Sequence, residues 1–280
     1  MLYFLLFSLS LVLFFPSNSH GFVVVNLLRL HPNVAASASC TPHVPPLQQT
    51  KGTKTRTDIT NIMVYKKKKT NLYAISPSSS SNNDPYSNMS PRQLVSIGMN
   101  EFKQANIHKS IELFDLADSL VPNSALTPYL WQRGISLYYN HDFQQGSLQF
   151  RYDVKVNPLD VEEIVWDIAC QNQLQLQNPE YEIKKMALPQ GQKDRRRIMS
   201  VVYNLFRGDA TEAELAKAGH EGNPSDLFYA LFYLGLYCES IGEISKAEHY
   251  MKEAVKSEYA NGRGDYMTSC ARVHSLVYVM

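Results

Sequence analysis

The chain has 280 residues and is 44% hydrophobic, with 17 Tyr and 12 Phe. It is therefore long enough for one or two domains with a stable core, and this composition excludes a fully disordered chain. The net charge is +1, but residues 22–80 carry eight basic side chains and one acidic one, which leaves −6 on residues 81–280. A body of that charge is a poor partner for nucleic-acid phosphates or an anionic membrane surface.

Residues 1–21 have the features of a secretory signal peptide, with cleavage expected after Gly21. Leu2–Phe15 is an uncharged apolar run that is too short to span a bilayer comfortably. Residues 22–80 begin with Phe22, are rich in Ser, Thr, Lys and Asn, and contain almost no acids, as transit peptides do. This order resembles the bipartite plastid presequence of diatoms and related algae with complex plastids. The resemblance implies a protein of the plastid stroma; ordinary secretion is the alternative.

The cysteines favour a reducing compartment. Cys40 lies in the presumed leader, which leaves Cys170, Cys238 and Cys270 in the body. An odd number without a Cys-x-x-Cys pair argues against a disulfide framework or a zinc ribbon, so we expect small core residues.

The helical region is expected to begin at Ser90, after a Ser-, Asn- and Pro-rich linker at 81–89. Ser90-Pro91-Arg92-Gln93 combines an N-cap Ser, a Pro at the first helical position and a Gln three residues later. No sustained alternation of period two follows, so residues 90–280 are predicted to be an all-α domain.

An internal repeat of 36 residues organises this domain. Its first two copies agree at five positions: Gly98 and Gly134, Phe102 and Tyr138, Ile107 and Phe143, Phe114 and Phe150, and Pro122 and Pro158. A third copy surrounds Gly235. The pattern predicts helical hairpins at about 91–122, 127–158 and 228–259. Between the second and third hairpins, helices at 159–227 are expected as degenerate repeats or as packing helices, and a terminal helix at 265–279 is expected to cover the last hairpin.

The spacing within each copy predicts how two helices pack. A helical Gly is unfavourable unless another helix must approach closely. A small residue follows each Gly after 12 positions and a large apolar residue after 16, and both should face it across the hairpin. These residues are Ser110, Gly146 and Ala247, and then Phe114, Phe150 and Met251. Position 19 is Ala117 and Ala254 in two copies but Asp153 in the second. The pattern is typical of tetratricopeptide repeats, which stack in a right-handed superhelix.

Several segments also resemble the NlpI family of bacterial outer-membrane lipoproteins, which belong to the tetratricopeptide class. They are Gln132–Tyr139, Phe232–Tyr237 and Gly242-Glu243. The body, including Gly264–Met267, is similar to plastid tetratricopeptide proteins of plants and algae. The resemblance implies an adaptor that can form a homodimer and present partners to proteases and hydrolases. A lipobox cysteine is missing, so the membrane anchor does not carry over. The family's cell-wall partners are not expected in a plastid.

The first helix of each hairpin should line a groove that binds a protein partner. The expected groove residues are Val95, Met99, Phe102 and Lys103, then Trp131, Ile135, Tyr138 and Tyr139, and finally Phe232, Leu236 and Glu239. Val95 and Met99 stand where a carboxylate clamp for chaperone C-termini needs Lys and Asn. The groove is instead aromatic and apolar, which suits an amphipathic helix or an extended apolar segment. Alternatively, the protein's own helices or a dimer partner fill it.

No constellation for catalysis, metal or cofactor binding is found. The histidines of the body are isolated, without spacing that would place two ligands on one helical face. Phosphate-cradling glycine motifs and a Gly-x-Ser-x-Gly elbow are missing. We therefore expect a non-enzymatic interaction scaffold without cofactor, metal or nucleic acid and without a membrane span in the mature form. The alternatives are a self-assembling structural subunit and an enzyme with an unfamiliar helical site.

Overall fold

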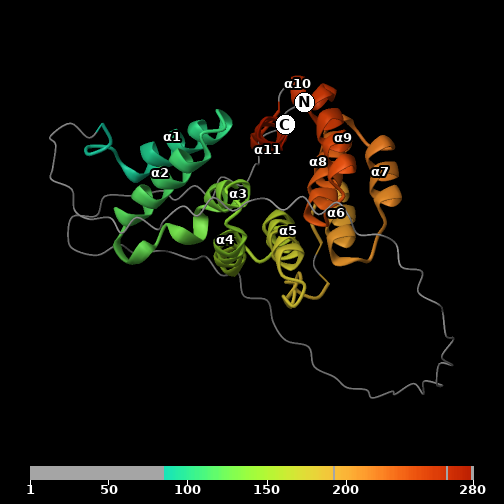
Figure 1. Ribbon diagram of the computed structural model, residues 1–280, viewed down its shortest axis with the longest axis horizontal. Helices are drawn as coiled ribbons and strands as arrows, with labels where there is room; N and C mark the ends of the chain where they lie inside the picture. The colour runs from blue at the N-terminus through green and yellow to red at the C-terminus, as the bar shows by residue number, and fades with distance from the viewer. Residues whose placement is uncertain (1–84, 192, 263, 279–280) are drawn as a thin grey trace, which may run out of the picture. The chain divides into compact units, whose positions relative to one another are not determined.

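The structure is a computed structural model that describes residues 85–191, 193–262 and 264–278 (Figure 1). Within these residues the chain is all-helical and contains no strand, which confirms the predicted fold class. The expected signal peptide and transit peptide, residues 1–80, lie outside the described residues, as do residues 81–84 of the linker.

The first four helices form two hairpins. Helices α1 (Pro91–Lys103) and α2 (Ile107–Ser119) make the first, and α3 (Trp131–Tyr139) and α4 (Phe143–Val156) make the second. The short 3-10 turns η1 (Pro122–Ser124) and η2 (Thr127–Tyr129) connect them. The Ser90 side chain caps α1 in the predicted capping box. Pro122 follows the end of α2, and Pro158 follows the end of α4, because proline cannot continue a helix.

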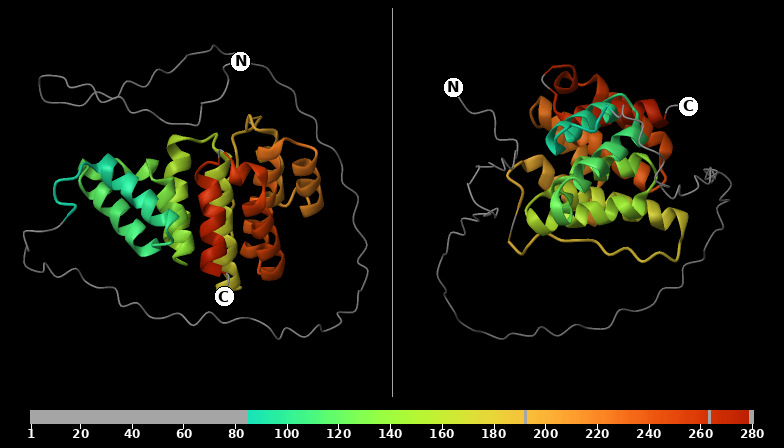
Figure 2. Two further views of the ribbon diagram at one scale, coloured as in Figure 1. Left: turned by 90° about the horizontal axis from the view of Figure 1, so that it is seen from above. Right: turned by 90° about the vertical axis from the view of Figure 1, so that its left-hand side faces the viewer.

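Seven more helices follow among the described residues. They are α5 (Val161–Gln177), α6 (Arg197–Arg207), α7 (Glu212–His220), α8 (Pro224–Ser240), α9 (Ile244–Lys256), α10 (Glu258–Asn261) and α11 (Tyr266–Tyr278). The described residues between α5 and α6, 178–191 and 193–196, have no helix. From α1 to α10 each helix packs on the next, and α8 and α9 form a third hairpin. Helix α11 instead packs on α9 and α1 (Figures 1 and 2).

The hairpin glycines lie at close helix contacts. A β-carbon at Gly134 would lie 2.7 Å from Cζ of Phe150, and one at Gly235 would lie 2.8 Å from Cγ of Met251. At Gly98 the nearest atom would be Cε1 of Phe114, at 3.2 Å. In all three hairpins the large residue 16 positions later therefore fills the space that the glycine leaves.

The small residues of the pattern are buried with them. Ser110, 12 positions after Gly98, hydrogen-bonds across to Ser136 of the next hairpin at 2.9 Å. Gly146 lies against Cys170 of α5. The remaining small residues are Ala117, Ala247 and Ala254, all buried.

The three hairpin turns share one backbone conformation. Their middle residues are Ala105, His141 and Gly242, with φ values of 62°, 59° and 87°. Only the third is the glycine that a left-handed conformation favours. The repeat thus extends to the backbone of the turns, where the amino-acid pattern does not show it.

Candidate protein-binding face

Most of the predicted groove residues lie in the hydrophobic core. Seven of them are buried: Phe102, Ile135, Tyr138, Tyr139, Phe232, Leu236 and Glu239. Met99, Trp131 and Val95 are half-buried, and Lys103 is exposed. The expected open groove along all three hairpins is therefore not present. The structure corresponds to the alternative in which the protein's own helices fill it.

Helix α5 fills the middle of this region with Trp166, whose side chain is 1% exposed. The Trp166 ring lies 5.2 Å from the ring of Tyr138 and 6.1 Å from that of Phe232. It also stacks at 6.0 Å on Phe150. Aromatic rings bury more area than other side chains, so a free aromatic groove beside Trp166 would leave that area in water. Phe232 and Tyr138 are therefore structural residues.

Helix α11 covers the part of the face that α1 and α3 form. Tyr266 stacks on Phe102 at 5.6 Å and meets the Trp131 ring edge-on at 5.3 Å. Eight and twelve residues further along α11, His274 and Tyr278 lie 5.8 and 6.2 Å from the ring of Tyr139. We call Phe102, Trp131, Tyr139 and His141 the α11-binding face; His141 also contacts Tyr278, at 5.8 Å.

Hydrogen bonds and burial complement these ring contacts. The Tyr139 hydroxyl lies 3.4 Å from the backbone oxygen of Cys270 and 3.4 Å from Nδ1 of His274. Burial lowers the pKa of His274 to about 3. The imidazole is therefore neutral at neutral pH, as its position between aromatic rings requires.

A hollow of about 430 Å³ remains open where α1 meets the start of α11. Met99 and Lys103 of the predicted groove line it, together with Tyr266 and Arg272 of α11. The Lys103 ammonium lies 5.8 Å above the Tyr266 ring. Lys103, the exposed residue of the predicted groove, lies at this rim.

Glu239 lies where α3, α5 and α8 converge. It accepts hydrogen bonds from the Tyr138 hydroxyl and, at 2.6 Å, from Nε2 of Gln173. Burial raises the pKa of Glu239 to about 7, although hydrogen bonds from Tyr138 and Tyr278 act in the opposite direction. Asp153, at the alanine position of the second hairpin, is also buried, and burial raises its pKa to about 8.

A second polar cluster joins α5 to the segment before α6. Arg196 donates to Glu162 and to Asp194, each at 2.9 Å, and the Tyr233 hydroxyl donates to Glu162 at 2.7 Å. Burial raises the pKa of Glu162 against the opposing effect of Arg196. Burial opposes the charge of Arg196, but Glu162 and Asp194 together raise its pKa. Arg196 thus offsets part of the negative charge of Glu162 and Asp194 where α5 meets the segment before α6.

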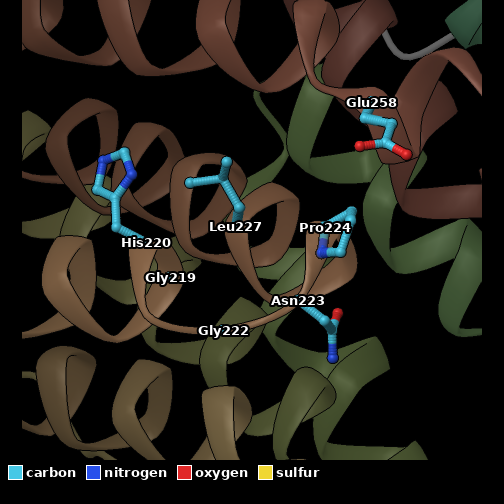
Figure 3. Close-up of a pocket in the computed structure, with 7 residues that line it drawn as sticks. All are labelled: Gly219, His220, Gly222, Asn223, Pro224, Leu227 and Glu258. Atoms are coloured by element: carbon cyan, nitrogen blue, oxygen red, sulfur yellow. The ribbon is translucent and has the colours of Figure 1, made fainter.

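One further hollow, of about 210 Å³, lies between the end of α7 and the start of α8. Figure 3 shows its lining, with His220 and Glu258 as the ionisable side chains. Both are exposed, and neither belongs to a buried network. This hollow therefore lacks the convergent polar groups of a catalytic site.

Within the described ranges, no group of three His, Cys, Asp or Glu side chains could hold a metal ion. The three cysteines of these ranges are buried free thiols. No described helix has the length and apolar character that crossing a bilayer requires.

Sequence reasoning missed the partner of the α11-binding face. Tyr266, Cys270, His274 and Tyr278 follow one another at intervals of four, which places them along one side of a helix. That spacing is visible in the sequence, but it does not say which surface the helix covers.

Comparison with known proteins adds no further guide: no protein-family model matches this chain, and no curated relative is found.

Proposed function

We propose that this protein is a non-enzymatic interaction scaffold of the plastid stroma, of the tetratricopeptide class, that holds an α-helical segment of a partner protein. The observation that carries the proposal is the seating of α11. The face formed by α1 and α3 accepts a helix from more than 120 residues away in the sequence, through aromatic rings with polar edges. A surface with this chemistry suits helical segments in general.

Two further observations support a scaffold. The Glu162–Arg196 and Glu239 clusters hydrogen-bond within themselves, so their polar groups hold helices together. The repeated hairpins agree with the spacing of stacked-repeat proteins, which commonly bind other proteins. The plastid part of the proposal rests on the resemblance of residues 1–80 to a bipartite presequence.

Photo-cross-linking in extracts of isolated plastids tests this proposal. A benzophenone side chain replaces Lys103, at the open rim beside α11, in the full-length chain. A matched chain carries the benzophenone at Leu148, which is 43% exposed on α4. We expect a partner protein to be cross-linked from position 103 but not from position 148.

Identical cross-linked proteins from both positions, or none from position 103, would overturn the proposed binding face. Cross-links from Leu148 to a second copy of the chain would instead favour the self-assembling subunit. Leu148, Tyr152 and Val156 form an exposed apolar stripe along α4 that such a contact would cover.

A further inference from the structure

The α11-binding face has a resident ligand that belongs to the same chain. We propose that this face receives an amphipathic helix of a partner protein and that α11 is the built-in competitor that the partner displaces. This inference rests on the proposed scaffold function and names the ligand class and the regulation of its site. The partner helix carries aromatic residues where α11 has Tyr266 and Tyr278, and a small residue where α11 has Cys270.

The contacts of α11 define this ligand. Its two outer rings lie against Phe102 and Trp131 at one end and against Tyr139 and His141 at the other. Between them, Cys270 is fully buried, so only a small side chain fits there. Asp265 precedes the first aromatic residue and lines the hollow beside Lys103 of α1. A partner helix with an acidic residue at its start would match this lysine.

Helix α11 is fixed at its first residues. The hydroxyls of Tyr229 and Tyr259 donate to Oδ2 of Asp265 at 2.5 and 2.9 Å, and the Met267 amide donates to Oδ1 at 2.9 Å. At the other end the Tyr278 ring contacts Tyr139 and His141, its hydroxyl hydrogen-bonds to Glu239, and Leu276 is 66% exposed. Release of α11 from this end therefore has to break the contacts of Tyr278, while Asp265 keeps the helix attached.

Three covered aromatic side chains of α11 can be released into water at a moderate cost, whereas the buried apolar Met267, Ala271 and Val273 of the same helix oppose release. Tyr266, His274 and Tyr278 combine an apolar ring with a polar group, so they can face solvent at a smaller cost than Phe or Leu. The Tyr266 hydroxyl is buried and has no hydrogen-bond partner among the described residues. A buried hydroxyl without a partner weakens the docked state, because release restores its hydrogen bonds to water.

The native cysteines report on this opening in the full-length chain. Cys270 is buried on the inner side of α11, whereas Cys170 is buried between α4 and α5, and burial raises the pKa of both thiols. Under native conditions a maleimide should label Cys270 faster than Cys170, measured peptide by peptide in a mass spectrometer. Labelling of Cys270 then reports local release, and labelling of Cys170 reports global unfolding.

Two variants at one position move this equilibrium in opposite directions. Tyr266→Ala removes the ring contacts and should raise Cys270 labelling about tenfold, with Cys170 labelling unchanged. Tyr266→Phe keeps the ring and removes the unpartnered hydroxyl, and should lower Cys270 labelling about fivefold. Neither substitution changes the receiving face.

A synthetic peptide with the sequence of residues 265–278, with Ala in place of Cys270, is the ligand probe. The tethered helix competes at a high effective concentration, so the peptide should bind wild type weakly. It should bind Tyr266→Ala more tightly, and Tyr266→Phe less tightly, by the same factors that Cys270 labelling shows.

The proposal would be overturned if Cys270 were labelled at the same rate as Cys170 in wild type, or if Cys270 were labelled at the same rate in wild type and in Tyr266→Phe. Equal affinity of the peptide for wild type, Tyr266→Ala and Tyr266→Phe would also overturn it. Peptide affinity could change with Cys270 labelling across the variants while position 103 gives no cross-linked partner. That result would support displacement of α11 from its face and reject the scaffold function. A cross-linked partner whose yield is the same in both Tyr266 variants would do the reverse.

Discussion

The α3–α4 hairpin and the α11-binding face bury aromatic rings in different ways. In the hairpin, Gly134 allows the Phe150 ring so close to the backbone that a β-carbon would lie 2.7 Å from it. At the α11-binding face, ring centroids are 5.3 to 6.2 Å apart and many of the rings have polar edges. Residues 16 positions apart make the first contact, and residues more than 120 positions apart make the second. The hairpin is thus a steric fit within one unit, whereas α11 packs through aromatic rings on a face formed by distant parts of the chain.

Phe150→Ala should give the largest effect and separate the two regions. The ring is fully buried between Gly134 and Trp166, so we expect the free energy of unfolding to fall by about 3–5 kcal/mol. Urea unfolding, followed by circular dichroism, measures it. Cys170 should become more reactive, since the cavity weakens the whole unit.

Tyr266→Ala is the matched comparison. It should leave the unfolding of the hairpins and the reactivity of Cys170 close to wild type, because α11 lies outside the steric contacts at Gly134. If Tyr266→Ala lowers the unfolding free energy as much as Phe150→Ala, α11 belongs to the same cooperative unit, and the distinction between the two regions fails.

Glu239→Gln should change how stability depends on pH. The pKa of Glu239 rises from an ordinary 4.5 to about 7 in the folded protein, so the folded state holds this proton more strongly than the unfolded state. Its contribution is therefore full at acidic pH and is lost as the pH rises from about 4.5 to 7, by about 3 kcal/mol. The glutamine variant should lose that part of the decline, in urea unfolding at pH 4.5 to 8.

Glu253→Gln is the control, because Glu253 pairs with Lys256 at 3.0 Å on the surface of α9. Its pH profile should follow wild type. If the Glu239→Gln profile also follows wild type, the decline in stability does not come from a raised pKa of Glu239 at the junction of α3, α5 and α8. Asp153 would then be the next candidate, since burial raises its pKa to about 8.

The contrast between contacts within one hairpin and contacts between distant helices explains which features the sequence could predict. Spacings of 12 and 16 residues lie within one hairpin, so the pattern contains both members of each contact at Gly98, Gly134 and Gly235. In the structure, each of these glycines lies against the large residue 16 positions later. The handedness of their stacking stays a prediction.

The covering of the groove could not be predicted in this way. Apolar periodicity shows which side of a helix avoids water, but it does not show which distant element covers that side. Trp166 and Tyr266 lie in helices that the repeat pattern does not describe, so their positions depend on the fold of the whole chain. The position of the segment between α5 and α6 also depends on a contact outside the repeat pattern: its Lys184 backbone amide donates a hydrogen bond to the Gln171 side chain at 2.6 Å.

The smallest expected change in stability comes from alanine substitutions at two hairpin glycines, Gly134 and Gly98, which both face a large residue 16 positions later. Gly134→Ala places a β-carbon 2.7 Å from the Phe150 ring, which itself stacks on Trp166 and cannot move freely. We expect a loss of about 1–3 kcal/mol in the free energy of unfolding from overpacking. Gly98→Ala places a β-carbon 3.2 Å from Phe114, where a shift of a few tenths of an ångström relieves the contact. Alanine also favours the helix by up to about 1 kcal/mol, so this variant should stay near wild type.

Urea unfolding of both variants measures the difference, and Cys270 labelling shows whether it reaches α11. Gly134→Ala should raise the labelling of Cys170 and Cys270 together, because it weakens the unit on which α11 rests. Equal stability of the two variants would mean that the hairpins adjust their spacing as readily as α11 does. The steric fit would then not be what sets the hairpins apart from the α11-binding face.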